Sequence, residues 1–392
     1  MPGYDHQPSP LTGDIVIVGG GPVGSALALG LHRQGCRVTV LEARVPGNAE
    51  DDARTLALSH GSRLILERLG VWPLPSAPTP IMAIQVSQHG GFGRVDMTAA
   101  EAGVPALGYV VEYGALQRAL TAALGQRGVR VESGCAALAV DGNTQCATVV
   151  LEQAGARREM PAKLVVIADG GASLALAAVK THDYRQSALV CGVTTGHAHQ
   201  NRAFERFTEE GPLALLPNAR GWALVWTARP ERAAALASLD EAAFCRQLCE
   251  AFGSALGEFA LCGARQVFPL RLKVAQRAVA PRCVLIGNAA QTLHPVAGQG
   301  FNLGLRDAFE LTRLMAARGA GDPGRQDILN AFFEQRRFDR TATILFTDSL
   351  IRLFSKDIPL LMPARGLGLA ALAAFPAARK FVARRMLFGA RG

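Results

Sequence analysis

The chain has 392 residues, of which 49% are hydrophobic and 19% charged, and it carries a formal net charge of +9. It is long enough for two domains with a sizeable core, and its basic balance favours cofactor phosphates, an acidic partner or an anionic membrane surface. Nucleic-acid binding is the poorer interpretation, because there is no Lys/Arg-rich tract and only four Tyr and three Trp are available for stacking.

Cysteine spacing and hydropathy argue against several other classes. None of the eight cysteines forms a CxxC pair, and Cys245 and Cys249, on a predicted helix, have no His at ligand spacing. We therefore expect reduced thiols and no metal site. Residues 1–13 lack the apolar core of a secretory signal. No run of about 18 uninterrupted apolar residues occurs, so we expect a cytoplasmic protein without a spanning helix, with membrane association left open.

The N-terminal elements predict a dinucleotide site. Residues 14–18 form an apolar, β-branched run typical of a central parallel strand, and residues 25–31 have the composition of a helix. The GxGxxG fingerprint between them permits a tight turn and close approach of a pyrophosphate. Its glycines are Gly19, Gly21 and Gly24. A second strand, residues 37–41, ends at Glu42, whose carboxylate can accept hydrogen bonds from a ribose. The alternative is a tight turn that binds nothing.

The following segments alternate between helices and strands. A helix at 62–69 is stopped by Gly70, and the prolines of 71–80 indicate a crossing out of the first domain. Residues 81–97 show strand-like alternation, and residues 116–124 are helical. Further strands are expected at 129–131, 136–141, 146–153 and 164–167.

After Asp169, which ends a buried strand, the pattern changes to short apolar strands typical of an antiparallel sheet. They lie at 187–194, 202–208, 213–217, 222–227 and 266–272. Between them, Asp240 begins a helix that runs through Cys249, and we expect its side chain to cap that helix.

The most informative stretch runs from Gly287 to Gly304. It follows an apolar strand at 283–286 and leads into a helix, so it is a glycine-rich loop at a helix start. Backbone amides at such a start favour negative charge. The residues singled out here are Gly287, Asn288, His294, Pro295, Gly298, Gly300, Phe301 and Asn302.

From residue 347 onward, basic and apolar residues interleave as in amphipathic helices. The simpler interpretation is a helical cap packed on the core. The alternative is docking on an anionic membrane or on a partner protein.

The three motifs in this order resemble the single-component FAD-dependent aromatic hydroxylases of the para-hydroxybenzoate hydroxylase fold. The order is GxGxxG, then Asp-Gly at 169–170, then Gly-Asn at 287–288 with its long loop. The resemblance spans nearly the whole chain. Residues 52–59 and 293–304 are similar to segments of the ubiquinone-biosynthesis hydroxylases.

Finer features look specifically like the 2-octaprenyl-6-methoxyphenol hydroxylases within that family. They are the segments 204–208 and 211–214. Two departures point the same way: Asn288 stands where most of these enzymes carry Asp, and residues 174–178 lack the usual Arg. The second departure concerns a segment to which the family assigns a part in meeting NAD(P)H.

The resemblance implies a mixed α/β fold: a Rossmann-like FAD-binding domain, an inserted, mostly antiparallel substrate sheet, and C-terminal helices. The discontinuous FAD-binding domain would comprise residues 1–75, 98–182 and 273–345. The substrate domain would comprise 76–97 and 183–272, and the helical region 346–392.

The same resemblance implies the roles of the site residues. Gly19, Gly21, Gly24 and Glu42 would hold the ADP end of FAD, and Asp169 and the loop from Gly287 the flavin end. Asn288 would bond a ribityl hydroxyl. The Gly298 turn would approach the flavin ring closely, and the amides of Gly300, Phe301 and Asn302 would stabilise negative charge there.

Other candidates surround the ring. Pro295 would lie beside the isoalloxazine, and Arg54 would be a cation near the phosphates or flavin, or else a surface salt-bridge partner. His294 is either a base or a histidine satisfied within its loop. The predicted substrate-lining residues are Trp222, Trp226, Phe268 and Pro269.

The activity implied is hydroxylation of a polyprenylated methoxyphenol in ubiquinone biosynthesis, with NAD(P)H and O2, through a C4a-hydroperoxyflavin. The alternatives are another ring position or phenol, a flavin-dependent prenyl reductase, or a non-catalytic flavin-binding subunit. A halogenase is disfavoured because residues 221–226 do not match WxWxIP. Implied partners are the polyprenyl phenol, a complex of ubiquinone-biosynthesis proteins and a membrane surface.

Overall fold

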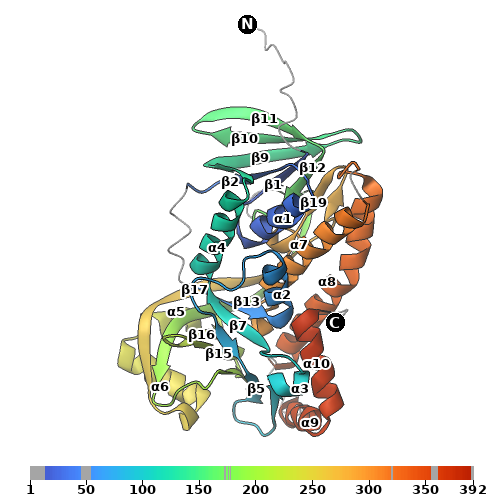
Figure 1. Ribbon diagram of the computed structural model, residues 1–392. Coiled ribbons are helices and arrows are strands. Elements are labelled where there is room, and N and C mark those ends of the chain that lie inside the picture. The colour runs from blue at the N-terminus through green and yellow to red at the C-terminus, as the bar shows by residue number, and fades with distance from the viewer. Residues whose placement is uncertain are drawn as a thin grey trace.

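A computed structural model describes residues 14–45, 54–171, 174, 176, 178–318, 321–354 and 361–389 (Figure 1). The N-terminus, where we expect no secretory signal, therefore lies outside the described residues, as do residues 52–53, most of 172–177 and residues 355–360 of the basic C-terminal segment. The described chain confirms the predicted mixed α/β fold, with a parallel sheet, a large mostly antiparallel sheet and C-terminal helices.

The four central strands of the parallel sheet are apolar and almost wholly buried on both faces, while its two edge strands are partly exposed. Its order is β18-β19-β12-β1-β2-β8, and only β18 runs antiparallel to its neighbour. The bounds are β1 Ile15–Val18, β2 Val38–Glu42, β8 Arg130–Ser133, β12 Leu164–Ile167, β18 Val279–Ala280 and β19 Cys283–Leu285. Three helices pack around it: α1 Pro22–Arg33, α4 Tyr113–Gln126 and α7 Gln299–Arg318.

Two small sheets flank this core. One contains β9 Cys135–Gly142, β10 Ala147–Gln153 and β11 Ala156–Ala162. The other contains β3 Thr55–Ser59, β4 Thr79–Ile81 and β7 Gly108–Glu112, followed by α2 His60–Arg68. Strands β3, β7 and β11 were not predicted from the sequence. The first four residues of β11 are exposed and three of them are charged, so the strand lacks the apolar alternation on which that prediction depends.

The large sheet has eight strands in the order β20-β17-β13-β16-β15-β14-β5-β6. Its pairs are antiparallel except β14 with β5. The bounds are β5 Ala83–Gln88, β6 Arg94–Thr98, β13 Val179–Thr195, β14 Arg202–Phe207, β15 Pro212–Asn218, β16 Gly221–Ala228, β17 Phe259–Ala275 and β20 Gln291–Thr292. Strands β13 and β17 are each much longer than predicted, because residues 179–183 pair with 271–275 and residues 192–195 pair with 259–262.

Helices cover the two faces of this sheet differently (Figure 1). One face packs against α5 Pro230–Ser238 and α6 Glu241–Phe252 through a cluster that includes Trp222, Trp226 and Phe244. The Asp240 side chain accepts the Ala243 amide at 2.7 Å, which confirms the predicted cap. The other face turns toward the C-terminal helices.

Those helices are α8 Gln326–Phe354, α9 Leu361–Ala374 and α10 Pro376–Phe388; the short α3, Ala99–Ala102, lies beside α10. Ala383 and Leu387 of α10 are buried against Ile81 and Met97, so the helices pack on the core. Among the described residues, no single helix is long and apolar enough to cross a membrane. Helices α9 and α10 pass the same test only as a pair, across a bend of 97°.

Candidate functional site

The parallel sheet brings three of the predicted motifs together at one edge. Strands β19, β12 and β1 are neighbours and run parallel, so their carboxyl ends meet. A Cβ atom on Gly19 would lie 2.4 Å from the Ala168 carbonyl oxygen. One on Gly171 would lie 2.8 Å from the Asn288 carbonyl oxygen, and Asn288 itself is exposed. The site is thus assembled from segments more than 100 residues apart.

The glycines of the first loop are explained by different physical requirements, one within the protein and one toward a ligand. A Cβ on Gly24 would lie 2.0 Å from the Gly19 carbonyl oxygen, which is the close contact between helix and strand that only glycine allows. A Cβ on Gly21 would meet only the Tyr113 hydroxyl, at 3.9 Å. Gly21 therefore faces open space at the start of α1, where a pyrophosphate can approach the backbone amides.

Glu42 lies beside this loop, at the end of β2. Its carboxylate accepts the Gly20 amide and the Arg44 guanidinium, both at 2.9 Å. Burial opposes its ionisation, but the hydrogen bonds from Arg44 and Gly20 outweigh burial and hold the pKa of Glu42 below its usual value. An ionised acceptor at this position suits a ribose hydroxyl.

The Asp169 side chain stabilises the turn that follows it in the chain. Its carboxylate accepts the Gly171 amide at 2.9 Å and the Leu174 amide at 3.2 Å. The carboxylate thereby sets the backbone that faces Asn288.

Several residues that were not predicted from the sequence also shape the first loop. Ser25 and Gln117 both donate to the Gly20 carbonyl, at 2.9 and 2.8 Å. Tyr113 begins α4 beside Gly21. Arg44, two residues after Glu42, could have been noticed from its spacing, whereas Tyr113 and Gln117 carry no local signal because only the packing of α4 brings them here.

Arg54 lies on the same side of the molecule as Tyr113 and Phe268. Its guanidinium is 5.3 Å from the centre of the Tyr113 ring and 6.0 Å from that of Phe268. Phe268 thus neighbours Arg54, while the adjacent Pro269 is exposed. These residues form an aromatic and cationic wall near the nucleotide loop.

The second glycine-rich loop turns sharply before α7. Gly298 has φ 59° and Gly300 has open space around its Cα. The amides of the first turn of α7 have no acceptors within the helix, so this start presents a positive end. The Asn302 side chain is already fully used: it accepts from Ser59 N and Ser62 Oγ, and donates to two carbonyls, those of Ala57 and Gly298. Only its backbone remains for a ligand.

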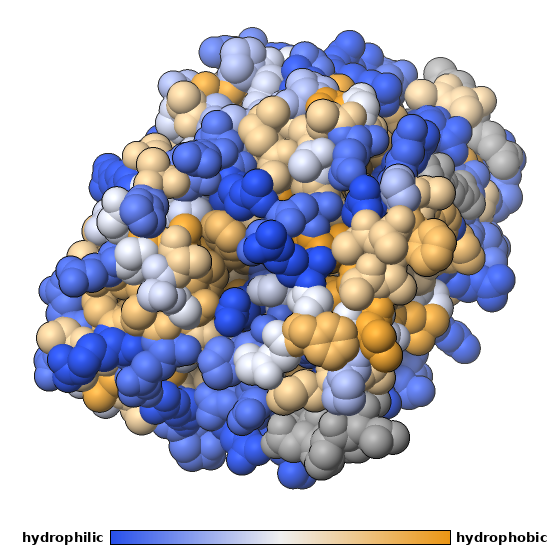
Figure 2. Space-filling model, turned by 90° about the horizontal axis from the view of Figure 1, so that it is seen from below, coloured by the Kyte–Doolittle hydropathy of each residue, from blue (hydrophilic) through white to orange (hydrophobic). Residues whose placement is uncertain are grey.

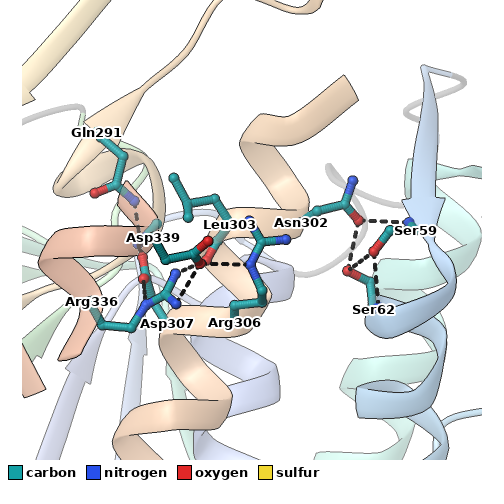
Figure 3. Close-up of polar contacts among 10 residues, drawn as sticks. Ser59, Ser62, Gln291, Asn302, Leu303, Arg306, Asp307, Arg336 and Asp339 are labelled. Carbon is teal, nitrogen blue, oxygen red and sulfur yellow. Dashed lines mark hydrogen bonds and ion pairs between the residues drawn. The ribbon is translucent and has the colours of Figure 1, made fainter. Parts of the chain in front are cut away.

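Buried ion pairs hold α7 from its other side (Figure 3). The Asp307 carboxylate accepts from Gly287 N at 3.0 Å, Gln291 Nε2 at 3.0 Å and Arg336 Nε at 2.7 Å. Arg336 and Arg306 both donate to Asp339 Oδ2, at 2.6 and 2.9 Å. These contacts tie α7, α8 and the Gly287 turn into one unit.

His294 occupies a closed position. It is 1% exposed, and its Nδ1 accepts the Val296 amide at 3.1 Å. Its ring lies edge-on to Tyr184, with 5.2 Å between ring centres. Burial lowers the pKa of His294 to about 4, so the ring is neutral at pH 7. With Nδ1 accepting, the proton lies on Nε2, which has no partner among the described residues. A catalytic role for His294 stays a prediction.

A cavity of about 250 Å³ adjoins this loop. The turn from Pro295 to Gly298 forms one wall, strands β5, β6 and β14 to β16 form the second, and helices α8 to α10 form the third. Apolar groups line nearly all of it, among them Val86, Met97, Leu350 and Met386. The cavity therefore favours an apolar guest beside Pro295.

The predicted substrate-lining residues do not line this cavity. Trp222 and Trp226 point to the opposite face of the sheet, where they are 2% and 3% exposed and pack under α5 and α6. Strand pairing explains the difference. Trp226 pairs with Leu213, whereas Val225 pairs with Ala214 and lines the cavity, so alternate residues face alternate sides. Neither Phe268 nor Pro269 reaches the cavity.

Comparison with known proteins gives consistent matches along most of the chain. The family described as "FAD binding domain" matches residues 12–345. The chain is 36% identical to ubiquinone hydroxylase UbiL of Rhodospirillum rubrum over 92% of this chain and 86% of that protein. It is 35% identical to 3-demethoxyubiquinol 3-hydroxylase of Escherichia coli (91% and 94% covered), and 30% identical to human ubiquinone biosynthesis monooxygenase COQ6 (91% and 89% covered).

Solved structures share the fold at low sequence identity. p-Nitrophenol 4-monooxygenase PnpA from Pseudomonas putida superposes with a TM-score of 0.77 at 17% identity, covering 97% of this chain and 99% of that one. OxyS anhydrotetracycline hydroxylase from Streptomyces rimosus gives 0.70 at 21% identity, covering 96% and 75%. These matches establish the architecture alone.

Proposed function

Because the chain belongs to the family of FAD-dependent ubiquinone hydroxylases, we propose that it uses NAD(P)H and O2 to hydroxylate the ring of a polyprenylated phenol in ubiquinone biosynthesis. The observation that carries the proposal is the apolar cavity beside Pro295. A ring bearing a long apolar tail needs such a lining, and a smaller polar phenol does not. The finer substrate is a methoxyphenol of the 2-octaprenyl-6-methoxyphenol type, supported by the segments 204–208 and 211–214.

The described residues suit FAD at both ends. Gly21 leaves room for a pyrophosphate, and Glu42 is an ionised acceptor beside the same loop, where it accepts the Gly20 amide. The first turn of α7 offers amides to negative charge on the ring system. When bound, the flavin supplies electron transfer from NAD(P)H and oxygen transfer to the substrate. The chain binds and orients both partners and keeps water out of the cavity.

A route for the tail runs along the C-terminal helices. Phe346 and Leu350 of α8 and Leu372 of α9 line the cavity, and exposed apolar side chains continue outward from it. The most exposed of these are Leu345, Leu367, Phe375 and Phe381. Figure 2, which views this end of the molecule, includes hydrophobic patches beside hydrophilic side chains. We propose that this surface contacts an anionic membrane, from which the substrate enters.

A second candidate is hydroxylation at another ring carbon. The Escherichia coli relative carries the name 3-demethoxyubiquinol 3-hydroxylase. Its sequence identity to this chain, 35%, is nearly that of the UbiL protein, 36%. The ring position thus depends on how the ring sits in the cavity.

The test uses the purified, FAD-loaded protein with NAD(P)H, ¹⁸O2 and a short-chain prenyl methoxyphenol. We expect one ¹⁸O atom in the ring product and substrate-dependent oxidation of NAD(P)H, detected by mass spectrometry and absorbance. Fragment analysis of the product identifies the hydroxylated carbon. A reduced prenyl chain without oxygen consumption would establish the reductase instead, and flavin binding without turnover of any phenol would establish a non-catalytic subunit.

A further inference from the structure

One ionisable side chain stands alone in the cavity, on strand β14. Among the described residues that line the cavity, Glu205 is the only one with a titratable side chain. The other lining groups from β5, β6, β15, β16, α8, α9 and α10 are apolar, apart from the hydroxyl of Thr227. Burying a carboxyl among apolar groups is costly unless it forms a hydrogen bond, so we expect the bound ligand to supply a polar partner.

Strand pairing fixes the direction of this carboxyl. Ala203 and Phe207, two residues to either side, pack on the cavity side, Ala203 with Met386 and Phe207 with Phe354. Side chains on a strand alternate between faces, so Glu205 points the same way. Its cross-strand partners Val86 and Ala214 also line the cavity.

No protein group in the described part of the chain bonds or pairs with this carboxyl. The hydrogen bonds and ion pairs of the described residues do not include it, and no charged group contributes to its titration. Arg365 of α9 lies over the Phe354 ring at 5.6 Å, and the neutral His294 ring lies edge-on to Tyr184 with its Nε2 unpartnered among the described residues. Burial alone raises the pKa of Glu205 to about 7.

We propose that Glu205 is a catalytic residue that accepts the proton of the substrate's phenolic hydroxyl, and this inference rests on the proposed function. The phenol O–H bond breaks, the proton passes to a Glu205 oxygen, and the electron pair stays on the phenolate. The phenolate donates electron density into the ring, which makes the ring carbon a better nucleophile toward the transferred oxygen.

The proton balance closes within one turnover. The ring carbon forms a C–O bond to one atom of O2 and later loses its hydrogen as a proton, while Glu205 returns its proton to the oxygen of the original hydroxyl. The second oxygen atom leaves as water, NAD(P)H is oxidised to NAD(P)+, and one further proton is consumed. Glu205 ends as it began.

The test compares three FAD-loaded proteins: wild type, Glu205→Gln and the control Glu209→Gln. Glu209 is exposed and does not line the cavity, so the control makes the same chemical change outside the cavity. Each protein is titrated with a short-chain prenyl methoxyphenol and with its methyl ether, and the flavin absorbance reports binding. Wild type and control should prefer the phenol to the ether, and Glu205→Gln should lose that preference.

The pH profile gives the second measurement. In wild type and control, kcat/KM should fall as the pH drops through about 7, because the protonated carboxyl cannot accept a proton. Glu205→Gln should lose this inflection and turn over about 10²- to 10⁴-fold more slowly. An inflection that survives in Glu205→Gln, or a rate within about threefold of wild type, overturns the proposal.

Thermal melting shows whether Glu205→Gln is folded and whether the carboxyl titrates as stated. Since the folded-state pKa lies above the ordinary value for Glu, wild type loses stability as pH rises from about 4 to about 7. The Tm of Glu205→Gln minus the Tm of wild type should therefore increase between pH 5 and pH 8. A Tm difference that stays constant with pH contradicts the burial on which the proposal depends.

Failure of the proposed function is distinguishable from failure of this inference. A wild type that binds the phenol but makes no hydroxylated product contradicts the function, while the preference for phenol over ether still decides the role of Glu205. A wild type that binds phenol and ether equally well, or neither, overturns the Glu205 proposal.

Discussion

At the scale of single residues, the same amino acid serves different physical purposes in one loop. Gly24 is required by the protein itself, because any Cβ would collide with the Gly19 carbonyl. Gly21 has φ −64° and open space, so the fold does not require it. The glycine at this position is explained by the close approach of a ligand.

Replacing Gly21 with Ala should therefore leave folding intact and weaken FAD binding at least about tenfold, which corresponds to about 1.4 kcal/mol. Gly24→Ala should lose both stability and FAD binding. The measurements are urea unfolding of the apoprotein and titration with FAD. Gly125→Ala is the matched control, since a Cβ in that turn of α4 meets nothing within 4 Å and should add about 0.5–1 kcal/mol of stability. Wild-type FAD affinity in Gly21→Ala would show that no pyrophosphate approaches there.

At the scale of elements, helix α7 is positioned from two sides before any ligand binds (Figure 3). Asn302 ties its first turn to β3 and α2, and Asp307 ties its third turn to α8 and to the Gly287 turn. The acceptor oxygens of Asp307 are nearly all in use, and the group is 4% exposed. Such a closed network sets the helix start that faces the flavin end of the site.

Substituting Asp307 with Asn should destabilise the protein by about 3–5 kcal/mol, because it removes the charge that pairs with the buried Arg336. It also places an NH2 group against two donors, the Gly287 amide and Gln291 Nε2. Urea unfolding measures the loss, and the flavin content of the purified protein reports displacement of the Gly287 turn. Glu310→Gln, one turn further along α7 in an exposed pair with Arg313, should cost no more than about 1 kcal/mol. Equal effects of the two substitutions would contradict the role given to the network.

At the scale of the whole molecule, the cavity exists only because three remote parts of the chain close around it. The loop at 295–298 lies at its inner end, the large sheet forms its side, and α8 to α10 cover it. Exposed apolar and basic groups then continue over α9 and α10, including Phe381, Lys380 and Arg384. The small sheet of β9 to β11 lies at the opposite end of the molecule (Figure 1).

If α9 and α10 contact a membrane, Phe381→Ser should weaken binding to vesicles of phosphatidylcholine and phosphatidylglycerol. The loss of a buried phenyl group corresponds to about 1.5–3 kcal/mol, hence about tenfold or more in partitioning. Phe381 is 60% exposed, so the fold should not suffer. Co-sedimentation measures binding, and Leu138→Ser on β9, 42% exposed in wild type, is the control. Unchanged sedimentation of Phe381→Ser would favour a protein partner for this surface.

The sequence alone determined the motifs whose chemistry is local: the glycine loop after β1, the acid at the end of β2, the cap of α6 and the glycine-rich start of α7. Each depends on neighbouring residues, so spacing and residue type suffice. Tertiary structure alone decided which face of the large sheet meets the cavity. The strand around residue 222 shows that apolar aromatic residues alone do not indicate that face, since Trp222 and Trp226 lie under α6 while Val225 lines the cavity. Tyr113, Gln117 and Glu205 acquire their roles from packing between segments far apart in the chain, which no local pattern encodes.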